Sequence, residues 1–280
     1  MQVGIMSGHF PRPTLEEALD AILGHGIRHL QFNPGSVNVE GTLADKLAKA
    51  PMVREETQKR GMTISAVGGP ANMVAVDEAQ RGQAIEKLKL LTSACAPMGT
   101  SVIATCTGSR DPGSMWRRHP DNETEKAWRV LRNTLEQVLP GAEAAGVVIA
   151  FEPEVNNVVN TAKKARRLID EMGSPSLGVV MDASNLFGKG DLPRMTWILD
   201  EAFELLGDHI AIAHAKDLDR DGDAGHLAAG TGKLDYAHYV SLLCALPFDA
   251  PVILHGLGED QVDASVAMLR GHAARHQAGA

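Results

Sequence analysis

VVIAFEPE, at residues 147–154, is an apolar run that ends in carboxylates, and runs of the same kind recur three times toward the C-terminus. The recurrences are LGVVMD (177–182), IAIAHAKD (210–217) and PVILHGL (251–257). Each run carries one residue of a metal-ligand type near its end, namely Glu152, Asp182, His214 and His255. Their separations of 30, 32 and 41 residues are about the length of one strand–helix unit with its crossover. The pattern predicts parallel strands whose ends converge on a polar site.

Four more apolar runs lie in the first half of the chain and complete a series of eight. They are QVGIMS (2–7), HLQFN (29–33), TISAVGG (63–69) and SVIATCTG (101–108). Helical spacing of apolar residues separates the runs, and Thr14 with Glu17 makes a capping-box signature before the first helix. Eight strand–helix units predict a closed (β/α)8 barrel, of the TIM-barrel type, that forms a single domain over residues 1–280.

An open, doubly wound sheet is the alternative fold for such an alternation. It would require a glycine-rich phosphate loop after the first strand. Here the first run is followed by SGHFPRP (7–13), which lacks GxGxxG spacing, and no Walker-type GxxxxGK(S/T) motif occurs in the chain. The sequence therefore favours the closed barrel.

Composition limits the partners and the compartment. The chain has 280 residues, 44% of them hydrophobic, and a net charge of −8, which disfavours nucleic acid and anionic membranes as partners. Its three cysteines form no CxxC motif and, being odd in number, no disulfide framework, so we expect a reducing, cytoplasmic location. We also expect no secretory signal, and no apolar run approaches the roughly 20 residues that span a bilayer.

In a closed barrel the chemistry lies at the C-terminal ends of the strands, where all four ligand-type residues fall. Carboxylate oxygen and imidazole nitrogen suit a divalent cation such as Mn²⁺, Co²⁺, Zn²⁺ or Mg²⁺. Taken singly, each residue has a simpler explanation: Asp182 could cap the helix that follows, and His214 or His255 could bond a neighbouring polar group. Their joint occurrence on consecutive strands favours one metal ion held by Glu152, Asp182, His214 and His255.

Several short motifs resemble those of the xylose-isomerase-like barrels, which include sugar isomerases and epimerases, inosose dehydratase, hydroxypyruvate isomerase and endonuclease IV. The motifs are FEPE (151–154), MDASN (181–185), AHAKD (213–217), GTGKLDY (230–236) and VILHGLGE (252–259), and the resemblance covers the whole chain. In the sugar-acting members a Glu, an Asp, a His and a second Glu bind one divalent metal. The resemblance implies that role for Glu152, Asp182 and His214.

The fourth position departs from the family pattern, because His255 stands where those members have glutamate. In the ketose epimerases the two glutamates also move protons on opposite faces of the substrate. A neutral histidine can act as acid or base, but a nitrogen that binds metal has no lone pair left for this. Asn185 stands where some relatives carry a further metal-binding histidine, so we expect a single metal, with Asn185 available to bind substrate.

Other residues are candidates for the pocket. Glu154 has the strand parity of Glu152, and Lys216 has that of His214, so both are candidate catalytic groups, although Lys216 could instead form a salt bridge to Asp182 or Glu152. His9 and Asn33 follow the first two strands and are expected to bind substrate hydroxyls. The long polar loop at 108–125 offers Trp116 for stacking on a sugar and Arg117 for a carboxylate or phosphate. The alternative is that the loop is solvated and does not bind substrate.

These features predict a metal-dependent isomerase or epimerase of a keto-sugar, polyol or sugar acid that works through a metal-stabilised enediolate. Glu152 or Glu154 would be the base, with His255 or Lys216 on the opposite side. A lyase that expels water or CO₂ from the same enolate is the alternative, since the second glutamate is missing. An endonuclease IV-like nuclease is disfavoured by the net negative charge and by Asn185. A non-catalytic ligand-binding barrel is a third functional hypothesis. The expected partner is a small carbohydrate or sugar acid, and homo-oligomerisation stays open.

Overall fold

The computed structural model describes residues 1–36 and 39–279, and within them eight parallel strands close into a barrel. The strands are β1 (Gln2–Met6), β2 (His29–Phe32), β3 (Thr63–Gly68), β4 (Val102–Cys106), β5 (Val148–Glu152), β6 (Leu177–Asp182), β7 (Ile210–Asp217) and β9 (Pro251–Leu254). Each pairs in parallel with the next, and β9 pairs with β1 to complete the circle. The short strand β8 (Leu227–Ala228) pairs antiparallel with the end of β7. The closed barrel predicted from the sequence is confirmed.

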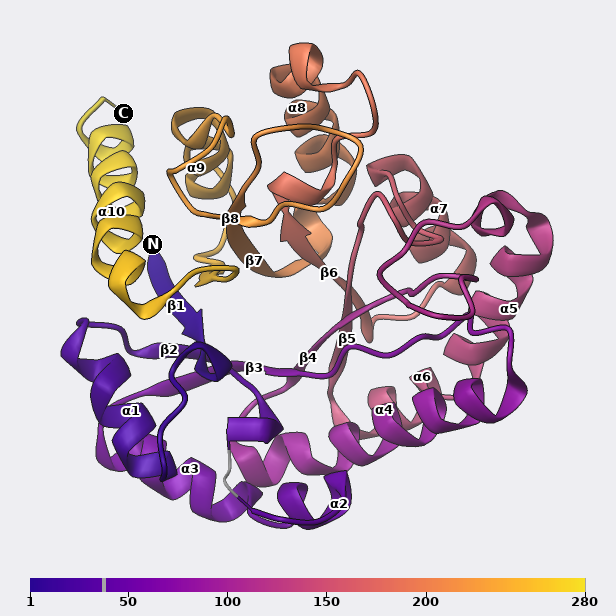
Figure 1. Ribbon diagram of the computed structural model, residues 1–280, viewed down its shortest axis with the longest axis horizontal. Helices are drawn as coiled ribbons and strands as arrows, with labels where there is room; N and C mark the ends of the chain where they lie inside the picture. Colours follow the sequence, from indigo (N-terminus) through magenta and orange to yellow (C-terminus); the bar gives the residue numbers. More distant parts are fainter. Residues whose placement is uncertain (37–38, 280) are drawn as a thin grey trace.

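The helices lie outside the strands (Figure 1). Their bounds are α1 (Leu15–Gly24), α2 (Leu43–Leu47), α3 (Ala50–Lys59), α4 (Glu78–Met98), α5 (Glu125–Glu136), α6 (Leu139–Ala145), α7 (Ala162–Met172), α8 (Met195–Leu206), α9 (Tyr236–Cys244) and α10 (Val262–Gly279). The last helix contacts both α9 and β1, which joins the two ends of the chain around the barrel. No helix in the described part of the chain is long and apolar enough to cross a membrane.

Local signals in the sequence explain where these elements begin and what they bury. Thr14 and Glu17 form the reciprocal capping box at the start of α1, where two otherwise unpaired backbone amides find acceptors. The same helix buries the apolar stripe that its spacing predicts, which consists of Leu15, Ala18, Leu19 and Ile22. All six residues of β6 are buried, because a parallel strand of a barrel is covered on both faces.

Two apolar layers result from this arrangement. The larger lies between strands and helices, and the smaller fills the barrel interior. The interior layer is made of Ala66, Ala104, Ala150, Val180, Ile212 and Ile253. Polar side chains begin above it toward the C-terminal ends of the strands, where the register sets Asp182 beside His214. The packed interior thus forms a floor for the polar site.

Candidate functional site

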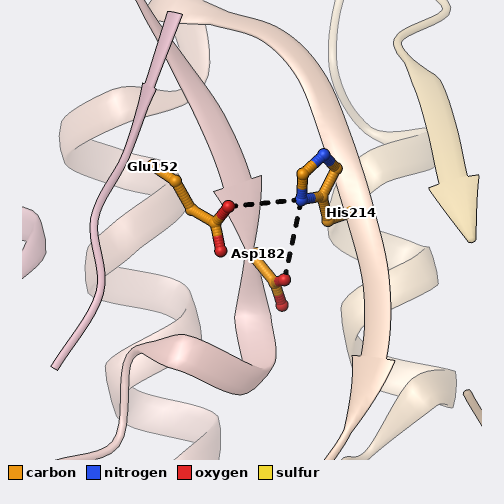
Figure 2. A group of neighbouring side chains, drawn as sticks. All are labelled: Glu152, Asp182 and His214. Carbon is orange, nitrogen blue, oxygen red and sulfur yellow. Dashed lines mark ion pairs between the residues drawn. The ribbon is translucent and has the colours of Figure 1, made fainter. Parts of the chain in front are cut away.

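Three ligand-type side chains from neighbouring strands meet at one point. Glu152 ends β5, Asp182 ends β6 and His214 lies in β7, and a ligand atom of each lies within 4.8 Å of those of the other two. The Nδ1 atom of His214 is 3.3 Å from Oε2 of Glu152 and 3.8 Å from Oδ2 of Asp182. Figure 2 shows both carboxylates directed at this ring nitrogen. The three residues therefore offer one nitrogen and two sets of oxygens to a shared point.

The hydrogen bonds around this cluster leave its ligand atoms free. His214 Nδ1 and Asp182 Oδ2 are buried and have no hydrogen-bond partner, which is uncommon for buried polar atoms. On the far side of the ring, His214 Nε2 lies 2.8 Å from Oε1 of Gln31, a buried residue of β2. An amide oxygen accepts from Nε2–H, so the Nδ1 lone pair faces the carboxylates. This donor set fits a divalent cation.

Lys216 supplies the positive charge closest to the carboxylates. Its buried ammonium lies 3.2 Å from Oδ2 of Asp182, without hydrogen-bond geometry, and 3.9 Å from Oε1 of Glu152. Burial alone would raise the pKa of Glu152, but the ammonium of Lys216 holds that pKa well below its ordinary value. For Asp182 burial prevails, and its pKa is raised. The salt bridge considered for Lys216 is therefore present, alongside its position in the cavity wall.

Glu154 lies beyond the end of β5, yet its side chain is buried. Its backbone amide donates to Val159 O at 3.0 Å, and its Oε2 accepts from Asn157 Nδ2 at 3.0 Å. The other oxygen, Oε1, has no partner. Burial, reinforced by the charge of Glu152, raises the pKa of Glu154 to about 8. A carboxyl group with such a pKa can hold or release a proton near neutrality.

His255 follows β9 and stacks on His214, with ring centroids 5.6 Å apart and an interplanar angle of 8°. Its Nδ1 atom is buried without a hydrogen-bond partner, and burial lowers its pKa well below the ordinary value. The cluster of mutually close ligand atoms consists of Glu152, Asp182 and His214, without His255. The four predicted ligands thus share one end of the barrel, but His255 stands beside the set of three.

A cavity of about 660 Å³ opens over the cluster. Among the predicted site residues, its wall includes Asn33, Trp116, Glu152, Glu154, Asn185, His214, Lys216 and His255. Asn185 donates from Nδ2 to Oε1 of Glu152 and accepts from Gly225 N at 2.8 Å, so its amide holds the carboxylate in place. Trp116 keeps half of its surface exposed at this wall.

Two predicted substrate-binding residues lie outside the wall. Arg117 is exposed, and its guanidinium lies 3.5 Å from Asp111 in its own loop, because the loop folds so that this side chain faces solvent. His9 accepts a hydrogen bond at Nε2 from Gly256 N at 3.3 Å, and its ring meets His255 edge-on at 5.8 Å. His9 therefore contacts the site through His255. The polar lining residues that were not predicted from the sequence include Gln31, Lys46 and Lys87. Only Gln31 gave a signal, as an amide inside the apolar run HLQF.

Comparisons with known proteins concern the family and the fold. The model of the xylose isomerase-like TIM barrel family matches residues 19–272. The apo structure of 3-keto-D-glucoside 4-epimerase from E. coli has 18% sequence identity and a TM-score of 0.75, covering 97% of this chain and 99% of that one. A structure of the IOLI protein with a bound zinc atom has 16% identity and a TM-score of 0.74, covering 99% of both chains. At these identities the likeness shows the fold alone.

One curated relative is similar in sequence over a shorter stretch. A mannonate dehydratase from Saccharophagus degradans is 29% identical over 103 residues, which are 34% of this chain. The match spans 25% of that relative's length.

Proposed function

Because the chain belongs to the xylose isomerase-like TIM barrel family, we propose that it is a divalent-metal-dependent isomerase or epimerase of a keto-sugar, polyol or sugar acid. The observation that carries the proposal is the free Nδ1 of His214, which two carboxylates face at the wall of a large cavity. A structural relative described as a sugar epimerase and another with bound zinc support it.

Glu152, Asp182 and His214 would hold the metal. When bound, a divalent cation acts as a Lewis acid that polarises a substrate carbonyl and eases loss of the proton next to it. Gln31 fixes the tautomer of His214, and Asn185 orients Glu152. Lys216, whose ammonium neutralises part of the carboxylate charge, is also positioned to donate a hydrogen bond to a substrate oxygen.

Proton transfer would fall to Glu154 and His255. Each lines the cavity and has a buried atom without a partner, Oε1 in Glu154 and Nδ1 in His255. They follow β5 and β9, so the strands that carry Asp182 and His214 lie between them. One group would take the proton from the carbon next to the carbonyl and the other would return a proton from a different direction. This arrangement would replace the two glutamates of the ketose epimerases with a glutamate and a histidine.

A lyase is the second candidate, favoured by the partial similarity to a mannonate dehydratase. Loss of water needs a base at the carbon next to the carbonyl and an acid at the departing hydroxyl. Glu154 is suited to the acid role, since burial raises its pKa to about 8, so that its carboxyl group still holds a proton at neutral pH. The two candidates share the metal site and differ in the product.

The test is proton exchange. The Mn²⁺-loaded protein is incubated in D₂O with a panel of ketoses and sugar acids, and NMR follows both deuterium at the carbon next to the carbonyl and the products. We expect exchange with at least one sugar, with an epimer or isomer as the product of an isomerase and a dehydrated keto-acid as that of a lyase. Absence of exchange across the panel, in protein that holds metal, would refute enolate chemistry.

A further inference from the structure

Two lysines in the cavity wall have no acidic partner. Lys46 lies on α2 and Lys87 on α4, and both are half-buried. No carboxylate of the described residues is within ion-pair distance of either ammonium. Lys87 donates one hydrogen bond, 2.7 Å long, to the carbonyl oxygen of Pro70 in the loop after β3. An ammonium has three N–H donors, so two of them remain for a ligand.

The other nine lysines of the chain differ in one of two ways. Some have a carboxylate partner, namely Lys59, Lys89, Lys163, Lys164 and Lys216. The rest are exposed to solvent, namely Lys49, Lys126, Lys189 and Lys233. Partial burial of an unpaired cation is costly, and burial lowers the pKa of Lys87. An anionic ligand beside Lys46 and Lys87 would remove this cost.

The two lysines are set apart from the candidate metal ligands. Helix α2 follows β2 and helix α4 follows β3, whereas the ligands lie on β5, β6 and β7, so β4 lies between the two groups around the barrel. Helices α2 and α4 contact each other (Figure 1). The cavity between the groups falls within the roughly 300–1,000 Å³ typical of small-molecule pockets, which leaves room for a sugar with a charged substituent.

We propose that Lys46 and Lys87 bind an anionic substituent, a carboxylate or a phosphate ester, on the sugar whose carbonyl lies at the Glu152–Asp182–His214 end. The preferred substrate is then a keto-sugar acid or a keto-sugar phosphate rather than a neutral sugar. The assignment of the carbonyl end rests on the proposed function, whereas the recognition of the anion rests on the lysines alone. The exposed ring of Trp116, in the same wall, offers a stacking face for the sugar.

Binding measurements test the proposal without requiring turnover. D-fructose, D-fructuronate and D-fructose 6-phosphate share one carbon chain and carry a hydroxyl, a carboxylate and a phosphate ester at C6. Calorimetric titration of each into the metal-loaded protein at low salt should give at least about tenfold tighter binding of one or both anions, because charge-assisted hydrogen bonds are the stronger kind. Which anion binds more tightly identifies the substituent. The preference should weaken as ionic strength rises.

Variants then assign the preference to the lysines. Lys46→Met with Lys87→Met keeps the aliphatic bulk of both side chains and should reduce the preference for anions to less than about threefold. The arginine pair, Lys46→Arg with Lys87→Arg, should retain part of it. Lys49→Met with Lys89→Met, two exposed lysines outside the cavity wall, is the matched control and should leave it unchanged. Thermal melting checks that each variant is folded. If the double methionine variant does not fold, the two single variants are used in its place.

Equal binding of the neutral sugar and both anions by the wild type would overturn the proposal. So would an anion preference that survives loss of both lysines. The proposed function fails differently, through absence of deuterium exchange across the whole panel of ketoses and sugar acids, and that result leaves the binding comparison intact.

Discussion

The Nε2 atom of His214 lies 2.8 Å from Oε1 of Gln31, and this contact decides which ring nitrogen carries the proton. Gln31 comes from β2, whereas His214 comes from β7, so the contact crosses the barrel interior rather than linking adjacent strands. With Nε2–H donating to the amide oxygen, Nδ1 carries the lone pair toward Glu152 and Asp182.

Replacing Gln31 should therefore weaken metal binding without removing a ligand. We expect Gln31→Met to lower the affinity for Zn²⁺ or Mn²⁺ by roughly 10- to 100-fold, because partners that orient a ligating histidine contribute on that scale. Competition with a chromophoric chelator measures it. Gln83→Met, at an exposed glutamine of α4, is the control. Equal metal affinities in the two variants would show that Gln31 does not contribute to metal binding.

Glu154 should affect proton transfer and not metal retention. Glu154→Gln removes the proton-carrying group while keeping the size of the side chain and its contact with Asn157. We expect deuterium exchange to fall at least about 100-fold, the low end for loss of a general acid or base. Metal content should match the wild type. Glu259→Gln, whose carboxylate pairs with Arg12 outside the cavity, should exchange normally; a similar loss in both variants would contradict the role.

Stability should fall on the acid side of neutrality because of His29. Burial lowers the pKa of His29 below its ordinary value of about 6.5, although Asp249 partly offsets this. The unfolded chain therefore binds more protons at this position, and its contribution to stability is present above pH 6.5 and is lost as pH falls toward the folded-state pKa. Urea unfolding at pH 7.5 and 5.5 should show a smaller loss in His29→Gln than in the wild type. A loss as large as that of the wild type would assign the acid sensitivity to other groups.

Tyr239 contacts the backbone of the two strands that carry Asp182 and His214. Its buried hydroxyl lies 2.8 Å from Met181 O and 3.0 Å from His214 O, which joins β6 and β7 next to the ligands. Tyr239→Phe leaves these buried carbonyls without that donor and should reduce the free energy of unfolding by about 1–3 kcal/mol. Urea denaturation gives the value. A change within a few tenths of a kcal/mol would mean that neither carbonyl depends on the hydroxyl.

Much of the fold could be predicted because the strands are buried on both faces. Each becomes a continuous apolar run, so β6 at Leu177–Asp182 matches its predicted range, and the capping box at Thr14 marks the start of α1 directly. The positions of strand-end residues follow from the same reasoning. Glu152, Asp182 and His214 converge because parallel strands place their C-terminal ends at one rim.

The remaining features depend on contacts between distant segments. Glu154 lies past the end of its strand and is turned inward by backbone hydrogen bonds in residues 154–159. The hydrophobic periodicity of the sequence does not predict these bonds. Arg117 is directed outward by the fold of its own loop. Lys46 and Lys87 reach the cavity from helices whose charged residues normally face solvent, so spacing alone does not distinguish them from exposed lysines.

Metal binding by the purified protein is the most direct test of the site formed by Glu152, Asp182 and His214. Elemental analysis and calorimetric titration of metal-stripped protein should give one divalent ion per chain, together with a rise in melting temperature on adding Mn²⁺ or Zn²⁺. His214→Ala should abolish both, whereas His276→Ala, near the end of α10, should retain them. Wild-type protein that binds no divalent ion, or a His214→Ala variant that binds and is stabilised as the wild type is, would contradict the account.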